Sequence, residues 1–367
     1  MMTGRKKYAL GLLAAFFMGG VSSIIALKLQ LPPYHTFANL YYQWVRPTLV
    51  KDDPDEAVVP HIRIATEADV VRTREQLIAF FWPDGIPAGV PQVETDLSSP
   101  SSHAAERVDR FTVRMDHGIT SIAYRFIPKN RNGHLILYHR GHEGSSPHHD
   151  RNISQLIGQG FEVVAFWMPL TGENSQPWIE HPSIGRLRLL THDHLRFAHE
   201  GGHPTRFFME PVVFVLNHLT ATERYRSISM IGLSGGGWTT AVASAIDTRI
   251  QFSFPVAGSM PLSMRSGGDL GDYEQVSSQL YSIANYFELY VMGASGEGRR
   301  QLQILNEFDP CCFSGRAALN YAETIDNIAT GKFDVMIDSS HGRHEISRGA
   351  LTRIVSEILG NAPPSRT

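Results

Sequence analysis

Two apolar runs constrain the fold of this chain more than any other feature. Residues 134–139 and 161–167 are apolar at nearly every position, and a helical pattern at 153–160 separates them. A strand that is apolar on both faces must be buried on both, as in a parallel sheet between two layers of helices. Strand patterns follow, alternating with helical patterns, at 227–232, 252–257, 301–307 and 333–338. The sequence therefore predicts an α/β fold with a mainly parallel central sheet flanked by helices.

Composition excludes several classes of protein. The chain has 367 residues, of which 42% are hydrophobic and 19% charged, with a formal net charge of −3. This is too apolar for a disordered chain, and the absence of a basic block argues against nucleic acid as a partner. Two cysteines are too few for a disulfide scaffold.

The N-terminus has the pattern of a membrane anchor. Arg5, Lys6 and Lys7 precede an uncharged, apolar run at 8–27, which is about the length that crosses a bilayer as a helix. The cationic flank predicts a cytoplasmic N-terminus. We expect residues 1–31 to form a transmembrane signal anchor, which places the rest of the chain in the periplasm or outside the cell. A cleaved signal peptide, giving a secreted protein, and a buried core helix are the alternatives.

Residues 232–236 carry the most informative motif. Gly232-Leu233-Ser234-Gly235-Gly236 matches G-x-S-x-G, with a strand pattern entering it and a helical pattern leaving it. A serine in such a turn is lifted clear of the sheet, and small neighbours make room for the tight crossing. The amide of Gly235 would lie at a helix N-terminus, where it can stabilise an oxyanion.

With this motif, the chain resembles the α/β-hydrolase family over about residues 105–360. The resemblance implies an eight-stranded sheet and a serine nucleophile followed in the chain by an acid and then a histidine. It also implies a lid between core strands, which we assign to residues 170–205. Residues 32–68 are then a connector, and 69–367 form one α/β-hydrolase catalytic domain.

The best candidate for the acid is Asp309. It follows the strand pattern at 301–307 and precedes Pro310, so it lies at the end of a strand on the carboxyl edge of the sheet. Glu307 and Asp272 are weaker candidates. A carboxylate is needed there because it orients the histidine that takes the serine proton.

The best candidate for the base is His341, which follows the strand pattern at 333–338 and precedes the last helix. His344 lies three residues further on and is the alternative. Either histidine would make Ser234 nucleophilic by accepting its proton.

The second oxyanion donor is expected in the loop after residues 134–139. This loop resembles the glycine-rich loop of the family, and we place the donor amide at Gly141 or His142, beside that of Gly235. Arg140 stands where the family has a small residue. We expect it either to pair with Glu143 or to contact substrate.

Neither histidine cluster predicts a metal or another cofactor. Residues 148–150 and 192–194 each hold two histidines and an aspartate, but neighbouring side chains diverge and zinc needs convergent ligands. We expect the histidines and arginines of 170–205 to line a polar substrate entrance. Cys311 and Cys312 are expected to be buried thiols, with a disulfide between them as the alternative.

These features together predict a membrane-anchored serine hydrolase that cleaves a carboxylic ester through an acyl-enzyme on Ser234. The expected substrate is a small-molecule or carbohydrate ester. An acyltransferase or a peptidase with the same triad, and a non-catalytic binding protein with this fold, are the alternatives.

Overall fold

The structure, a computed structural model, describes residues 61–97, 105–142, 146–265 and 271–360. The chain divides into two compact units, Met1–Lys51 and Asp52–Thr367, and every described residue belongs to the second. Among the described residues, no helix is both long and apolar enough to cross a membrane. The anchor expected at 8–27 lies outside the described residues.

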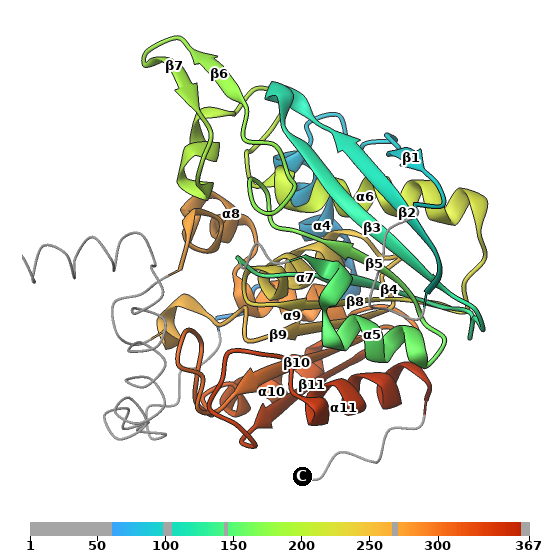
Figure 1. The fold of residues 1–367 in the computed structure, drawn as a ribbon. Helices are drawn as coiled ribbons and strands as arrows, with labels where there is room; N and C mark the ends of the chain where they lie inside the picture. Colours follow the sequence, from blue (N-terminus) through green and yellow to red (C-terminus); the bar gives the residue numbers. More distant parts are fainter. Residues whose placement is uncertain (1–60, 98–104, 143–145, 266–270, 361–367) are drawn as a thin grey trace, which may run out of the picture. The chain divides into compact units, whose positions relative to one another are not determined.

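In the described part of the chain, nine strands form one sheet in the order β1-β2-β3-β5-β4-β8-β9-β10-β11 (Figure 1). They are β1 (Gln92–Glu94), β2 (Ala105–Arg114), β3 (Thr120–Pro128), β4 (His134–His139), β5 (Glu162–Phe166), β8 (Ser227–Leu233), β9 (Phe252–Val256), β10 (Arg300–Asn306) and β11 (Lys332–Asp338). The strands from β5 to β11 in this order are parallel to one another. The mainly parallel sheet is confirmed, and the short strand β1, paired antiparallel with β2, exceeds the eight strands that the resemblance implied.

Helices cover both faces of this sheet. They are α4 (Glu67–Phe81), α5 (Arg151–Gly158), α6 (Arg206–Thr222), α7 (Gly235–Ile246), α8 (Ser278–Ile283), α9 (Tyr286–Ala294), α10 (Leu319–Ile328) and α11 (Arg348–Ile358). Helices α5 and α11 pack on one face, and α4, α6, α7, α9 and α10 on the other (Figure 1). Each face has its own hydrophobic core, which explains why β4 and β5 are apolar at nearly every position.

Residues before α4 also pack on this body. Ile64 is buried, and Arg63 forms an ion pair of 2.6 Å with the buried carboxylate of Glu288. Helix α4 begins at a capping box, in which Thr66 accepts from the amide of Asp69 and the Asp69 carboxylate accepts from the amide of Thr66. These contacts fix the N-terminal end of the described body.

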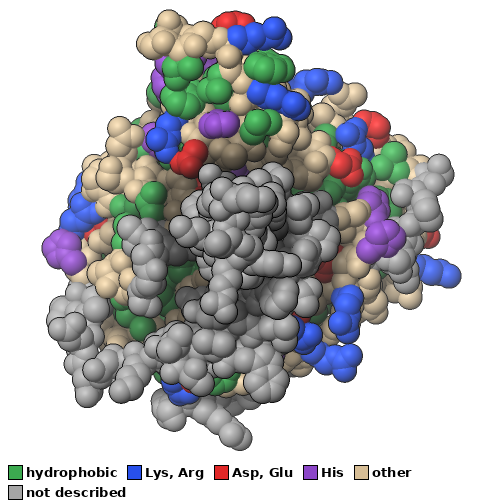
Figure 2. All heavy atoms as spheres, turned by 60° about the vertical axis from the view of Figure 1, so that its left-hand side comes forward, with side chains coloured by type: hydrophobic (Ala, Val, Ile, Leu, Met, Phe, Trp, Pro, Cys, Tyr) green, Lys and Arg blue, Asp and Glu red, His purple; other side chains and the backbone are tan. Residues whose placement is uncertain are grey.

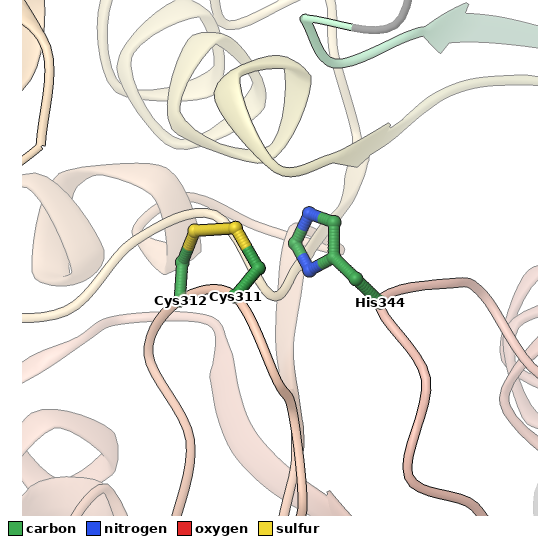
Figure 3. Close-up of side chains that lie close together, drawn as sticks. All are labelled: Cys311, Cys312 and His344. Carbon is green, nitrogen blue, oxygen red and sulfur yellow. A yellow bond between two sulfur atoms is a disulfide. The ribbon is translucent and has the colours of Figure 1, made fainter. Parts of the chain in front are cut away.

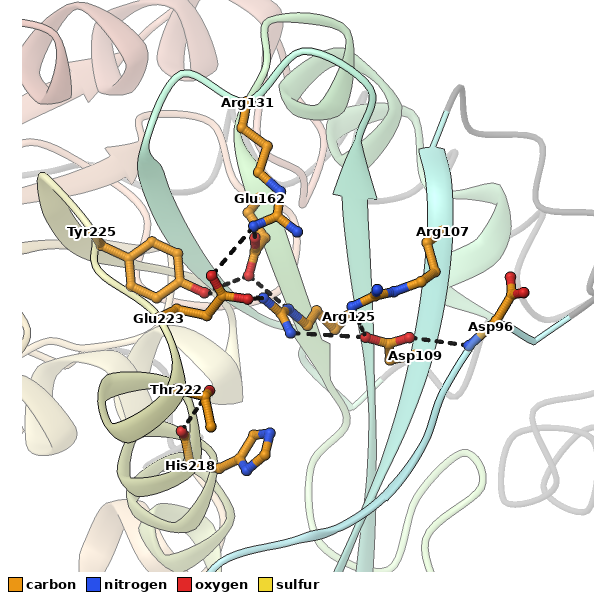
Figure 4. Close-up of polar contacts among 10 residues, drawn as sticks. All are labelled: Asp96, Arg107, Asp109, Arg125, Arg131, Glu162, His218, Thr222, Glu223 and Tyr225. Atoms are coloured by element: carbon orange, nitrogen blue, oxygen red, sulfur yellow. Dashed lines mark hydrogen bonds and ion pairs between the residues drawn. The ribbon is translucent and has the colours of Figure 1, made fainter.

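A buried charge network joins the antiparallel strands β2, β3 and β5 (Figure 4). Arg125 on β3 donates from Nε to Glu162 on β5 at 2.7 Å, and its Nη2 donates to Glu223 at 2.8 Å. Tyr225 donates its hydroxyl proton to the same Glu162 at 2.5 Å. Asp109 on β2 lies 3.8 Å from the guanidinium of Arg125. The network satisfies polar groups that burial would otherwise make costly.

The segment between β5 and α6 carries a second, two-stranded sheet, β6 (Trp178–His181) and β7 (Gly185–Arg188). Figure 2 shows hydrophobic and Lys or Arg side chains side by side over this hairpin, at the top of the view. Trp178 is 56% exposed, and the guanidinium carbon of Arg186 lies 4.9 Å from the centre of its ring. The segment therefore projects an aromatic and a cationic group into solvent.

Candidate active site

Ser234 occupies the turn between β8 and α7, with φ 58° and ψ −127°. A positive φ is unusual for a residue with a side chain, and it occurs where the surrounding structure holds the backbone in place. Here the amide of Ser234 donates to the carbonyl of Val256 at 2.9 Å, and its carbonyl accepts from Gly237 at 2.8 Å. Ser234 is half-buried and follows the last residue of β8, at the carboxyl edge of the sheet.

Three glycines allow this turn to form. A Cβ on Gly232 would lie 2.0 Å from the carbonyl oxygen of Gly236, and one on Gly236 would lie 2.2 Å from that of His139. A Cβ on Gly258, in the loop after β9, would lie 1.9 Å from the carbonyl oxygen of Ser234. No side chain fits at these positions without moving backbone, so the glycines explain why the crossing can be so tight.

The carboxylate of Asp309, which follows β10, is buried and faces an imidazole. Its Oδ2 lies 2.8 Å from Nδ1 of His344. The predicted base, His341, faces another carboxylate instead: its Nε2 lies 3.5 Å from Oδ2 of Asp338, and its Nδ1 accepts from the amide of Arg343. The pairing of His341 with Asp309 is therefore wrong, and the alternative, His344, takes its place.

Asn306, the last residue of β10, explains why His344 rather than His341 faces Asp309. Its buried Nδ2 lies 3.3 Å from the carbonyl oxygen of Arg343 and 3.1 Å from that of Glu345, so it holds the chain on both sides of His344. The same nitrogen donates to Oδ2 of Asp309 at 3.0 Å. One amide thus positions both members of the acid–histidine pair.

Asp338, the last residue of β11, is the carboxylate that lies close to His341. Burial would raise the pKa of this carboxyl, but hydrogen bonds from the hydroxyls of Ser340 and Ser347 outweigh burial and hold the pKa below its usual value. Asp338 is thus a buried anion that hydroxyl groups stabilise, and it binds the N-cap of α11, Ser347, rather than the pair at Asp309.

A vicinal disulfide supports the other oxygen of Asp309. Cys311 and Cys312 are joined, and Figure 3 shows the sulfurs beside the ring of His344. The amides of both cysteines donate to Oδ1 of Asp309, at 2.8 and 3.2 Å. The expectation of two buried thiols is wrong: the pair is oxidised, and Cys311 is exposed. The carboxylate accepts hydrogen bonds at both oxygens, which fixes its orientation toward His344.

The ring of His344 is set up to accept a proton. Because Nδ1 faces a carboxylate, which only accepts, the ring proton belongs on Nδ1 and the lone pair on Nε2. Nε2 is buried and makes no hydrogen bond with the part of the chain that the structure describes. Ser234, Asp309 and His344 follow β8, β10 and β11, which end at the same edge of the parallel sheet.

The loop after β4 lies against Ser234, as predicted for the oxyanion loop. A Cβ on Gly141 would lie 2.7 Å from Cβ of Ser234 and 3.4 Å from its hydroxyl oxygen. A Cβ on Gly235 would lie 2.8 Å from the ring of His142. Arg140 forms an ion pair of 2.5 Å with Asp150. Glu143, its expected partner, lies outside the described residues.

The predicted polar entrance is only partly made of exposed residues. Trp178 and Arg186 are exposed on the hairpin, but His192 is buried. His203 stacks on Phe80 with ring centres 4.2 Å apart. Burial lowers the pKa of His203 to about 4, so this ring is neutral at pH 7 and packs as an aromatic group.

Comparison with known proteins identifies the class of fold. No protein-family model and no curated protein matches the chain. Among solved structures, acetyl xylan esterase 1 from Thermoanaerobacterium sp. JW/SL YS485 is 15% identical, with a TM-score of 0.54 over 82% of this chain and 96% of that one. The acetyl xylan esterase from Paenibacillus sp. R4 is 16% identical, with a TM-score of 0.56 over the same shares.

A third similar structure, methylesterase BT1017, is 16% identical, with a TM-score of 0.51 over 80% of this chain and 63% of that one. The described body therefore has the α/β-hydrolase fold of these esterases, which confirms the resemblance at the level of the fold. At this identity the likeness does not extend to the substrate.

Proposed function

We propose that this protein is a serine hydrolase that cleaves a carboxylic ester through an acyl-enzyme. The observation that carries the proposal is the buried pair of Asp309 and His344 at the sheet edge that also carries Ser234, in which Nε2 of His344 has no hydrogen-bond partner among the described residues. A positioned base and a serine on a strained turn, both following strands that end at one edge of a parallel sheet, are the elements that nucleophilic acyl transfer needs.

Acylation begins when the hydroxyl oxygen of Ser234 attacks the ester carbonyl carbon while Nε2 of His344 takes the hydroxyl proton. The amide of Gly235 and an amide of the 141–142 loop stabilise the oxyanion that forms. The carbon–oxygen bond to the alcohol then breaks, and the alcohol leaves with the proton from Nε2.

Deacylation repeats these steps with water. Nε2 of His344 accepts a proton from the attacking water, the acid is released, and Ser234 recovers its proton. Asp309 remains ionised throughout, because it stabilises the imidazolium and keeps the proton on Nδ1.

Similar structures include two named acetyl xylan esterases, which supports a short acyl group on a carbohydrate or another small molecule as the substrate class. Acetylated oligosaccharides and aryl acetates are therefore the first substrates to assay.

A fluorophosphonate probe tests the nucleophile without knowledge of the substrate. We expect the native protein to be labelled and Ser234→Ala to remain unlabelled, with both proteins folded by circular dichroism. Well-folded native protein that stays unlabelled would overturn the assignment of Ser234.

The membrane anchor also remains a proposal. The apolar run at 8–27 supports a single-pass anchor with the enzyme on the extracytoplasmic side, and the Cys311–Cys312 disulfide supports an oxidising compartment. Membrane fractionation at alkaline pH tests this: an anchored protein stays in the pellet, whereas a secreted one is recovered shortened in the medium.

A further inference from the structure

Four metal-ligating side chains converge next to the oxyanion loop. His142 follows β4, His192 lies in the short helix His192–Phe197, and Asp272 and Glu274 lie at the helix Tyr273–Val276. One ligand atom from each residue lies within 4.8 Å of the others. His142 Nε2 is 2.6 Å from Asp272, and His192 Nδ1 is 3.3 Å from Glu274. Three separate segments of the chain thus form one cluster.

The ring of His192 is oriented as in metal-binding histidines. Its Nε2 lies 3.0 Å from the carbonyl oxygen of Pro169, which only accepts, so the ring proton belongs on Nε2. Nδ1 then faces Glu274 and Nε2 of His142, 3.1 Å away. A histidine that ligates a metal characteristically donates its other N–H to a carbonyl or a carboxylate in this way.

Glu274 provides an independent observation. Its side chain is 0% exposed, and neither carboxylate oxygen makes a hydrogen bond with the residues that the structure describes. Its only ion-pair partners in that part of the chain are the rings of His142 and His192. A buried carboxylate is costly unless a cation compensates it. No Lys or Arg of the described ranges forms an ion pair with Glu274, which leaves the two imidazole rings or a bound metal ion as the compensating charge.

From these observations we propose that His142, His192, Asp272 and Glu274 bind one divalent transition-metal ion of the zinc class. Two imidazole nitrogens with two carboxylates suit such an ion, whereas calcium and magnesium prefer oxygen ligands alone. Ligands at about 2.0–2.1 Å from a tetrahedral zinc lie about 3.3 Å apart. The contacts of 2.6, 3.1, 3.3 and 3.8 Å in the cluster bracket this spacing.

The ion would position the oxyanion loop. It would hold the ring of His142, which lies against Gly235, to the helices that carry His192 and Glu274. Asp272 is 53% exposed and His142 38%, so one side of the cluster is open for the ion to enter. Within this assignment His142 and its partners are positioning residues, since none of them takes or gives a proton in the hydrolysis.

A second group, Cys311, Cys312 and His344, is also close enough to hold a metal. Its sulfurs are bonded to each other, so neither is the thiolate that a metal requires. Metal bound after reduction by a thiol reagent would come from that group, and the experiment is therefore done under non-reducing conditions.

The experiment measures metal content and needs no substrate, so it is independent of the proposed hydrolysis. The full chain is stripped with a chelator, incubated with excess Zn²⁺, and passed over a desalting column before elemental analysis. We expect one ion per chain and a rise in the melting temperature that the chelator reverses. Replacement with Co²⁺ should give the intense visible bands of a tetrahedral nitrogen–oxygen site.

Variants locate the ion. Asp272→Asn removes an exposed ligand without disturbing the core and should raise the dissociation constant for Zn²⁺ at least about tenfold. Asp193→Asn is the matched control. Asp193 is an exposed carboxylate that follows His192 in the chain, and it pairs with Arg196 rather than with the cluster. Folded native protein that retains no zinc, or equal zinc binding by Asp272→Asn and Asp193→Asn, would overturn the site.

Discussion

Nδ1 of His344 lies 2.8 Å from Oδ2 of Asp309, and this contact distinguishes His344 from His341, the other histidine of the same loop. The ring of His341 faces Asp338 on the neighbouring strand. We therefore expect His344→Ala to lower kcat by about 10⁴-fold, because Ser234 loses its base. His341→Ala should leave kcat nearly unchanged. Steady-state kinetics on an aryl acetate measures both, and a greater loss in His341→Ala would contradict the assignment of the base.

The disulfide next to Asp309 should make activity sensitive to reductant. The amides of Cys311 and Cys312 hold Oδ1 of the carboxylate, so opening the disulfide loosens the group that orients His344. We expect reduction, verified by thiol titration, to lower kcat about tenfold. The double variant Cys311→Ser/Cys312→Ser should be slow in both conditions. Equal activity of native protein before and after complete reduction would rule out this role.

His139 should contribute to acid sensitivity. Burial lowers the pKa of this ring to about 4, although its bond to the carbonyl of Arg140 opposes the shift. Between about pH 6.5 and 4, His139 is protonated in the unfolded chain but remains neutral in the folded chain. The free energy of unfolding therefore falls as pH falls through this window. From pH 7 to pH 5 the loss from this group is about 2 kcal/mol in the free energy of unfolding.

Urea unfolding at the two pH values tests this. His139→Asn, which does not titrate, should lose about 2 kcal/mol less than the native protein between pH 7 and pH 5. His199→Asn, at an exposed histidine, is the control for the substitution itself. If the native protein and His139→Asn lost stability in parallel, His139 would not be the group responsible.

Arg125 should be the most important arginine in the charge network of Figure 4. Its side chain is 5% exposed, and it compensates Glu162 and Asp109, which are 2% and 1% exposed. We expect Arg125→Met to lower the free energy of unfolding by about 3–5 kcal/mol, since it leaves buried charges unpaired. Arg131 reaches Glu162 from the solvent side and is 39% exposed. Arg131→Met should therefore cost less than about 1 kcal/mol, and equal losses in urea unfolding would contradict this ranking.

The sequence predicts the fold because a strand that is buried on both faces of a sheet is a short, nearly continuous apolar run, which can be recognised locally. Strands β4 and β5 are apolar at nearly every position, and the glycines around Ser234 mark the turn after β8. Asp309 could be found because it follows a strand and precedes a proline. The hairpin of β6 and β7 could not, since its strands have four residues each and are mainly exposed.

The choice between His341 and His344 could not be read locally either. Both follow β11 in one loop, and the choice depends on Asn306, 37 residues before Arg343 in the chain, binding the backbone on both sides of His344. The proposed metal site could not be predicted from the sequence either, because its ligands come from distant segments. The clusters of neighbouring histidines point to different surroundings, whereas His142, His192 and Glu274 meet only when three segments pack together.

The glycines around Ser234 also limit how this protein can be altered. Gly232, Gly236 and Gly258 each have a backbone atom within 2.2 Å of the position that a Cβ would occupy, so a library that varied them would yield mostly damaged turns. Gly235 differs from these three glycines, because the nearest atoms to its Cβ position belong to the side chains of Met168 and His142. Among the glycines of this turn, it is therefore the position where a neighbouring side chain, rather than the backbone, has to move.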